Sequence, residues 1–149
     1  MHELQIREIR NDELQGLLGL YTQLHNDVMP ELDERVKKIW ENINNDPNHH
    51  IIVGLIDNKI VASCVLIVVY NLTHGQRPYA LVENVITDGA YRNRGYATEV
   101  LNHAKVSAQQ HNCYKIMLMT GSKEDATLRF YERAGYNRND KTAFIQWLD

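Results

Sequence analysis

The sequence has little of the features that mark several specialised classes of protein. It has two cysteines, Cys64 and Cys113, in 149 residues, which are too few for a disulfide framework and typical of a reducing compartment. Its longest apolar run, IVASCVLIVVY (60–70), is shorter than the 18 or so residues that a membrane span needs. The N-terminal segment MHELQIREIR lacks the apolar core of a signal peptide. We therefore expect a cytoplasmic protein with no membrane partner, and two thiols that are inert core residues.

Strong charge of one sign is also absent. The net charge is −3, so nothing indicates a surface for nucleic acid, and any basic spot stands out locally as a site for a small anion. A metal site is not expected either, because the adjacent His49 and His50 would point to opposite faces of a strand and could not chelate together. The ordinary hydrophobic content, 44%, predicts a single domain over residues 1–149 with a real core.

Hydrophobic periodicity predicts alternating helices and strands after two early helices. The first helix is expected after Asn11–Asp12, ending or broken at Pro30. The second carries an apolar stripe of Val36, Ile39, Trp40 and Ile43. Later helices are expected over about 97–108 and 124–134, and strands over 3–9, 49–56, 59–70, 79–87, 114–120 and 142–148. Asp57–Asn58–Lys59 reads as a hairpin turn. This order predicts an α+β fold, a mixed sheet with helices on its faces.

The stretch ENVITDGAYRNRGYATEVL (83–101) carries the clearest functional pattern. It leads from a strand into a helix, and the free N–H groups at a helix N-terminus favour a phosphate. Gly95 would let that anion approach the backbone, while Arg92 and Arg94 could add charge. The turn lacks the glycines of a dinucleotide fingerprint or a P-loop. It does match the pyrophosphate signature Q/R-x-x-G-x-G/A over residues 92–97. The alternatives are a solvated loop with surface arginines and a protein that binds nucleotide phosphates through the turn alone.

Two motifs together resemble the GCN5-related N-acetyltransferase (GNAT) superfamily. The first is VIT…AYRNRGYATEVL, and the second is LRFYERAGY (128–136), in the right order and at about the usual distance. The resemblance covers essentially the whole chain. It implies the GNAT (acyl-CoA N-acyltransferase) fold, with a central, mostly antiparallel sheet. It also implies acetyl-CoA as co-substrate, no metal, and a homodimer as one expected state, because dimers are common among relatives.

The resemblance implies a role for each matching residue. The turn would hold the CoA pyrophosphate through backbone N–H groups, and the end of the preceding strand would pair with the pantetheine arm in a gap between two splayed strands. Tyr131 would protonate the departing thiolate, although it could simply be core beside Leu128. Glu124 stands where relatives carry a pantetheine-binding asparagine, so Ser122 and Lys123 are the candidate replacements. The implied CoA-binding residues are Val85, Ile86, Thr87, Arg92, Asn93, Arg94, Gly95, Tyr96, Ala97, Thr98 and Ser122.

Acetyl transfer to an amine also needs a base and a group that stabilises the oxyanion. Glu83 is the candidate base, because strand alternation would place it on the same side as Val85 and Thr87. A structural hydrogen bond or ion pair is an equal alternative, and a carboxylate expected to be partly buried needs a partner in either case. Backbone N–H groups near Val85 or Ile86 could stabilise the oxyanion.

The expected function is therefore acetyl transfer from acetyl-CoA to a primary amine, by direct attack in a ternary complex. A small-molecule acceptor is favoured, and the acidic residues Glu31, Asp33 and Glu34 could attract a cationic one. Two alternatives stay open: a non-catalytic CoA-binding regulatory module of the same fold, and a protein or peptide N-terminal acetyltransferase.

Overall fold

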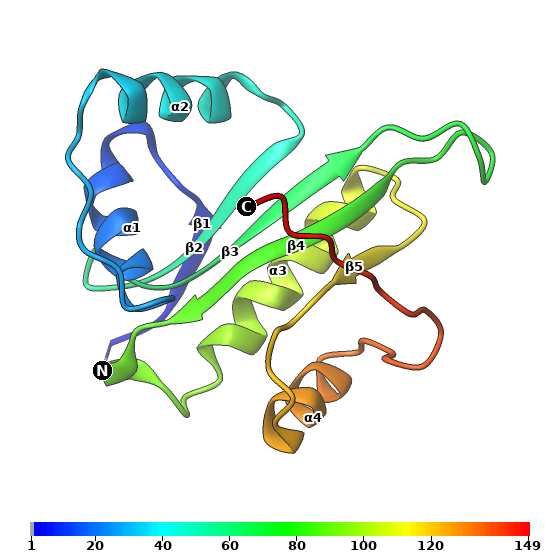
Figure 1. Ribbon diagram of the computed structural model, residues 1–149. Coiled ribbons are helices and arrows are strands. Elements are labelled where there is room, and N and C mark those ends of the chain that lie inside the picture. The colour runs from blue at the N-terminus through cyan, green and yellow to red at the C-terminus, as the bar shows by residue number, and fades with distance from the viewer. Residues whose placement is uncertain (1) are drawn as a thin grey trace.

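A computed structural model describes residues 2–149 and arranges five strands in one sheet (Figure 1). The strand order is β1-β2-β3-β4-β5, with antiparallel pairing up to β4 and parallel pairing between β4 and β5. The mixed, mostly antiparallel sheet confirms the predicted α+β class. The strands are β1 (Gln5–Glu8), β2 (His49–Ile56), β3 (Lys59–Val69), β4 (Tyr79–Thr87) and β5 (Ile116–Leu118).

Helices pack on both faces of this sheet. The helical elements are the short η1 (Asn11–Glu13), α1 (Leu14–Tyr21), α2 (Glu34–Asn45), the short η2 (Gly89–Tyr91), α3 (Tyr96–Gln110) and α4 (Asp125–Arg133). On one face α1 and α2 cover a cluster built around Leu17, Trp40 and Val65. On the other face α3 and α4 pack against a cluster that contains Cys64 and Val100. The strand β4 therefore has a face toward α1 and α2 and a face toward α3 and α4.

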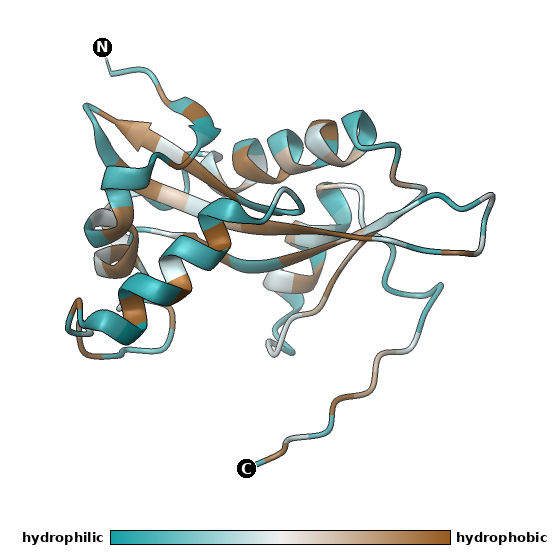
Figure 2. Cartoon of the chain, turned by 90° about the horizontal axis from the view of Figure 1, so that it is seen from above, coloured by the Kyte–Doolittle hydropathy of each residue, from teal (hydrophilic) through white to brown (hydrophobic). Residues whose placement is uncertain are grey.

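The central strands are apolar on both faces, which is why helices can cover both. All residues of β2 except His49 are buried, and alternate residues of β3 contribute to the two clusters. Figure 2 shows these strands as mainly hydrophobic, whereas the helices alternate hydrophobic and hydrophilic positions. The helices therefore bury one stripe against the sheet and leave the other in solvent.

The predicted hairpin turn between β2 and β3 is present in the structure, whereas two predicted element boundaries differ from it. Asp57 and Asn58 have positive φ angles of 50° and 66°, as a two-residue primed turn requires. The first helix, however, ends at Tyr21, well before Pro30, so the prediction that Pro30 ends it was wrong. The last pairing strand is also shorter than predicted, Ile116–Leu118 rather than 114–120.

The predicted terminal strand over 142–148 is wrong. Residues 141–149, which we call the C-terminal arm, form no strand. The arm passes in front of the sheet in Figure 1, and Figure 2 shows that it points away from the domain. Because strand pairing needs a neighbouring backbone, an arm held away from the sheet keeps extended, unpaired residues.

Candidate active site

The strands β4 and β5 separate partway along their length. Their ladder pairs Ala80 with Ile116, Leu81 with Met117 and Val82 with Leu118, and it ends there. The strand β4 continues to Thr87, so residues 83–87 have no strand partner on this side within the described chain. The structure thus contains the gap between splayed strands that the family resemblance implied.

A β-bulge lies in β4 beside this gap. Glu83 pairs with Val65 and Ile86 pairs with Ser63, so Asn84 and Val85 together face the single residue Cys64. Asn84 has a φ of 53°, a left-handed conformation that asparagine tolerates better than most residues. The extra residue of a bulge is left out of the ladder. The bulge therefore frees backbone polar groups at the start of the gap.

The bulge also corrects the predicted orientation of Glu83. One inserted residue reverses the alternation of side chains. Glu83 consequently shares the face of Val65, toward α1 and α2, whereas Val85 packs in the cluster on the α3 face. Thr87 pairs with Ala62 and also lies on the α3 face. Glu83 is exposed rather than partly buried, and within residues 2–149 its carboxylate makes no hydrogen bond or ion pair.

A short helical turn, η2, connects β4 to α3 and is fixed at its first residue. The Asp88 carboxylate accepts a hydrogen bond of 2.9 Å from the Ala90 N–H and lies 3.4 Å from the Lys59 ammonium. These contacts, the Ala90 N–H foremost, lower the pKa of Asp88. The Gly89 N–H donates to the Gln23 side-chain oxygen at 2.8 Å. The turn is therefore tied to the end of α1 and to the hairpin between β2 and β3.

The first turn of α3 presents unpaired N–H groups. Its N-cap is Gly95, whose φ is 81°, and no side chain caps the helix. Asn93 also has a positive φ, 62°. A Cβ added at Gly95 would meet no atom within 4 Å. The glycine is therefore required by its backbone angle, and the space in front of the uncapped N–H groups is open to an anion.

The two arginines of the turn fold back on it. Arg92 donates to the Thr87 carbonyl oxygen at 3.3 Å, and Arg94 donates to that of Ala90 at 3.5 Å. The Arg94 guanidinium also lies 5.3 Å from the centre of the Tyr91 ring, within the range of a cation–π contact. Both side chains thus brace the turn and keep positive charge beside it.

The helix α4 contributes Tyr131, which is half-buried in the cluster on the α3 face. Its ring lies 5.1 Å from that of Phe130, and burial raises its pKa. The phenol therefore stays protonated at neutral pH, as a proton donor must. Ser122 lies just before α4, and its hydroxyl oxygen accepts a 3.2 Å hydrogen bond from the Glu124 N–H. Ser122 thus helps to start the helix, and its hydroxyl proton is free for another acceptor.

One residue of this region, Asn84, was missed from the sequence, and Tyr21 lies beside it. An asparagine within the strand-like run LVENVIT could have indicated the bulge, because asparagine is disfavoured in strands. The Tyr21 hydroxyl, at the end of α1, is buried with no hydrogen-bond partner. Burial raises its pKa to about 12, and the nearby side chains of Asn84 and Ser63 partly oppose that rise. Tyr21 therefore points toward the bulge from the α1 side.

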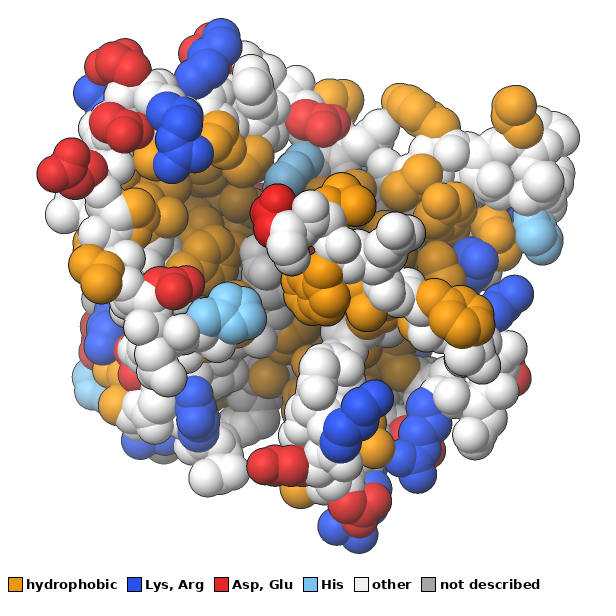
Figure 3. All heavy atoms as spheres, viewed as in Figure 1, with side chains coloured by type: hydrophobic (Ala, Val, Ile, Leu, Met, Phe, Trp, Pro, Cys, Tyr) orange, Lys and Arg blue, Asp and Glu red, His pale blue; other side chains and the backbone are white. Residues whose placement is uncertain are grey.

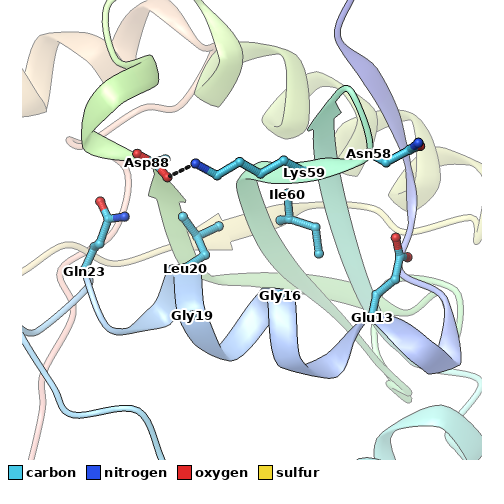
Figure 4. A pocket seen from close by; sticks show the side chains of 9 residues that line it. All are labelled: Glu13, Gly16, Gly19, Leu20, Gln23, Asn58, Lys59, Ile60 and Asp88. Carbon is cyan, nitrogen blue, oxygen red and sulfur yellow. Dashed lines mark ion pairs between the residues drawn. The ribbon is translucent and has the colours of Figure 1, made fainter.

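Hollows also lie outside the gap. A cavity of about 420 Å³ runs between α1 and the β2–β3 hairpin and ends at the Asp88–Lys59 ion pair (Figure 4). A hollow lined by hydrophobic side chains opens on the face drawn in Figure 3, between the α1 and α2 region and the C-terminal arm. Within residues 2–149 no group of three or more potential metal ligands comes together, and none of the described helices is both long and apolar enough to cross a bilayer.

The sequence model of the Acetyltransferase (GNAT) family matches residues 5–136. The chain belongs to the GNAT family. A solved structure of a candidate acetyltransferase from Agrobacterium tumefaciens is 38% identical, with a TM-score of 0.87 over 96% of this chain and 99% of that one. This GNAT chain is also similar to the glucosamine 6-phosphate N-acetyltransferase of Trypanosoma brucei brucei, at 28% identity over 56% of the chain. That match covers 54% of the trypanosomal protein, about half of its length.

An aminoglycoside N-acetyltransferase solved in complex with CoA shares the fold. Its TM-score is 0.80, with 14% identity, over 100% of this chain and 97% of that one. At this identity the likeness shows the architecture alone. The predicted GNAT fold is thereby confirmed.

Proposed function

We propose that this GNAT protein is an N-acetyltransferase that moves an acetyl group from acetyl-CoA to a primary amine of a small molecule, and that residues 1–149 act as a single domain. The observation that carries the proposal is the continuous backbone surface along one side of β4. It runs from the bulge at Asn84, along the free edge of residues 85–87, to the uncapped start of α3.

This surface fits the parts of acetyl-CoA in order. The unpaired N–H groups of residues 92–98 suit a pyrophosphate, and the braced Arg92 and Arg94 keep positive charge beside it. The free edge of Val85, Ile86 and Thr87 suits the amides of a pantetheine arm, which would pair as an added strand does. Ser122 lies just before α4 and can offer its hydroxyl proton. Acetyl-CoA supplies the acetyl group as a reactive thioester.

The residues around the bulge divide the chemistry among them. Backbone N–H groups freed at Asn84 and Val85 would stabilise negative charge on the carbonyl oxygen. Glu83, exposed on the face toward α1 and α2, would take a proton from the amine, directly or through water, since a free alkylamine has a pKa of about 10.4. Tyr131, kept protonated by burial, would supply a proton to the departing sulfur.

The cysteines favour direct attack by the amine rather than an acyl-enzyme. Cys64 lies opposite the bulge, but it is fully buried and burial raises its pKa to about 12. Its thiol therefore remains neutral and is not a nucleophile at physiological pH. Cys113 lies near the start of β5, and burial raises its pKa as well.

A small amine is the favoured acceptor. The hydrophobic hollow beside the α1 and α2 region opens on the face toward which Glu83 points, so an amine entering there would meet the carboxylate. Glu31, Asp33 and Glu34 are exposed around the start of α2 and would favour a cation. The named substrate of one similar protein, glucosamine 6-phosphate, is an amino sugar. We therefore place amino sugars first among the candidate acceptors.

The test combines binding and turnover. Calorimetric titration should show acetyl-CoA binding that Gly95→Glu abolishes, because the new side chain would enter the open space before α3 with a negative charge. A screen of amino sugars, polyamines, amino acids and peptide N-termini should then give turnover with a small amine. Tyr131→Phe should bind acetyl-CoA normally and lower kcat at least tenfold. Undetectable binding at millimolar acetyl-CoA would refute the proposal. Binding without turnover of any amine would indicate a regulatory module instead.

A further inference from the structure

The Tyr21 hydroxyl is a buried polar group that the acetyl transfer proposed above does not use. Tyr21 ends α1 and packs on the cluster that α1 and α2 cover. Its hydroxyl oxygen is buried and has no hydrogen-bond partner within residues 2–149. A buried hydroxyl without a partner costs free energy, and phenylalanine would fill the same space without that cost. The hydroxyl therefore indicates a use beyond packing.

Two polar side chains lie beside this hydroxyl. Burial raises the pKa of Tyr21 to about 12, and the side chains of Asn84 and Ser63 oppose that rise, so both lie close to it. Ser63 is fully buried, and its hydroxyl donates to the Ile52 carbonyl oxygen at 2.8 Å. A serine hydroxyl has one proton, so Ser63 can only accept from Tyr21. The Tyr21 proton would then go to Ser63, which leaves the Tyr21 oxygen to accept from the Asn84 amide.

The bulge brings Asn84 to the same face of β4 as Glu83. Glu83 lies on the face toward α1 and α2, and the Asn84 side chain lies beside Tyr21 on that face. Both Glu83 and Asn84 are exposed. A side-chain amide donates through its NH2 group and accepts through its carbonyl oxygen. With the NH2 group turned inward to Tyr21, the carbonyl oxygen of Asn84 would face outward beside the Glu83 carboxylate.

We propose, resting on the acetyl transfer inferred above, that Asn84 selects acceptors with a hydroxyl group on the carbon next to the amine. Glu83 takes the proton of the amine, and the Asn84 carbonyl oxygen accepts a hydrogen bond from that hydroxyl. Adjacent Cα atoms are about 3.8 Å apart, so two side chains on one face meet two neighbouring substituents. Tyr21 does not touch the acceptor; it is a positioning residue that holds the Asn84 amide through Ser63. Amino sugars belong to this class of amine.

Two amines that differ by one hydroxyl test this selection. The assay measures kcat/KM for trans-2-aminocyclohexanol and for cyclohexylamine by release of the CoA thiol at saturating acetyl-CoA. The natural chain should prefer the amino alcohol. Asn84→Gly keeps the φ of 53° without strain, and it should lower the ratio of the two kcat/KM values about tenfold, the loss expected for one hydrogen bond. The amines differ in pKa, but this difference is the same for both chains and cancels.

Tyr21→Phe separates positioning from packing. It keeps the ring and removes only the unpartnered hydroxyl, so thermal unfolding should not change while the same ratio falls. A merely structural role would lower kcat/KM for both amines equally and leave their ratio as it is. Asn112→Gly is the matched control: Asn112 has a φ of 61° and follows the C-terminal end of α3, whose other end is the phosphate site. The ratio should not change in this variant.

The outcomes distinguish this selection from the acetyl transfer on which it rests. Turnover of both amines with equal ratios in the natural chain and in Asn84→Gly would overturn the role of Asn84 and leave the acetyl transfer in place. A ratio that falls in Asn84→Gly but not in Tyr21→Phe would refute the positioning role of Tyr21. Binding of acetyl-CoA without turnover of any amine would refute the acetyl transfer, and the selection with it.

Discussion

Gly95→Ala tests the start of α3 as a phosphate site with a single added methyl group. Gly95 caps the helix at a φ of 81°, and the added Cβ would meet no protein atom within 4 Å. The substitution therefore costs stability only through backbone strain. A non-glycine residue in the left-handed region costs about 1–2 kcal/mol, and the stiffer unfolded chain returns about 0.4–1 kcal/mol. A net loss of about 1 kcal/mol should lower Tm by roughly 2–4 °C.

Gly95→Ala should cost more free energy in acetyl-CoA binding than this strain costs in stability. A backbone N–H bonded to a charged phosphate contributes about 1.5–3 kcal/mol. If relaxation of the turn misplaces one such N–H, Kd should rise about 10- to 100-fold, since 1.4 kcal/mol is a factor of ten. Calorimetric titration measures the Kd, and thermal unfolding without ligand measures the strain.

Gly75→Ala is the control with matched strain. Gly75 has a φ of 69°, lies in the loop between β3 and β4, and likewise has no atom within 4 Å of an added Cβ. Its Tm should fall by a similar amount while the Kd for acetyl-CoA stays within twofold of the natural value. Equal Kd values for Gly95→Ala and Gly75→Ala would refute the assignment of the α3 N-terminus as the pyrophosphate site.

Two further pairs of substitutions test the polar groups near the sheet. In urea unfolding, Tyr21→Phe should change the free energy of unfolding by less than about 0.5 kcal/mol, because it removes a buried hydroxyl that has no hydrogen-bond partner. Ser63→Ala removes a 2.8 Å hydrogen bond to the Ile52 carbonyl oxygen and should cost about 1–3 kcal/mol. Equal losses for the two variants would contradict the reasoning. Glu13→Gln should cost about 1–3 kcal/mol at pH 7, because Glu13 accepts two bonds of 2.7 and 2.8 Å from Arg7, which lower its pKa. A carboxylate with a lowered pKa stabilises the folded state at pH values above its ordinary pKa of about 4.3. The difference in the free energy of unfolding between the natural chain and Glu13→Gln should therefore shrink as the pH falls below that pKa, and a difference that grew would refute the reasoning. Glu41→Gln, at an exposed residue, is the control.

Most of the fold could be predicted because its elements are specified locally. The apolar runs of β2 and β3 need only length and composition to be recognised, and Asp57–Asn58 adopts the positive φ angles that these residues tolerate. The turn from β4 to α3 could be predicted from Gly95 for the same reason. The α2 N-terminus is equally local: Asp33 accepts a 2.9 Å bond from the Val36 N–H.

The wrong predictions concern residues whose conformation depends on distant parts of the chain. The C-terminal arm has the composition of a strand, but pairing depends on a neighbouring edge, and the arm leaves the domain instead. The length of β5 is decided by where β4 stops pairing with it, at Val82. The end of α1 is likewise set elsewhere, since Gln23 bonds to Gly89, 66 residues away in sequence.

The bulge at Asn84 shows how one local irregularity changes a functional argument. Strict alternation would place Glu83 and Val85 on one face, so that base, thioester and pantetheine edge would crowd together on it. With Asn84 at a φ of 53°, the carboxylate turns to the α1 and α2 face while Val85 keeps the α3 face. In the proposed reaction, the amine would therefore reach Glu83 from one face of β4, and Tyr131 would serve the sulfur from the α3 and α4 face. The backbone groups freed between them would lie where the acetyl group must pass.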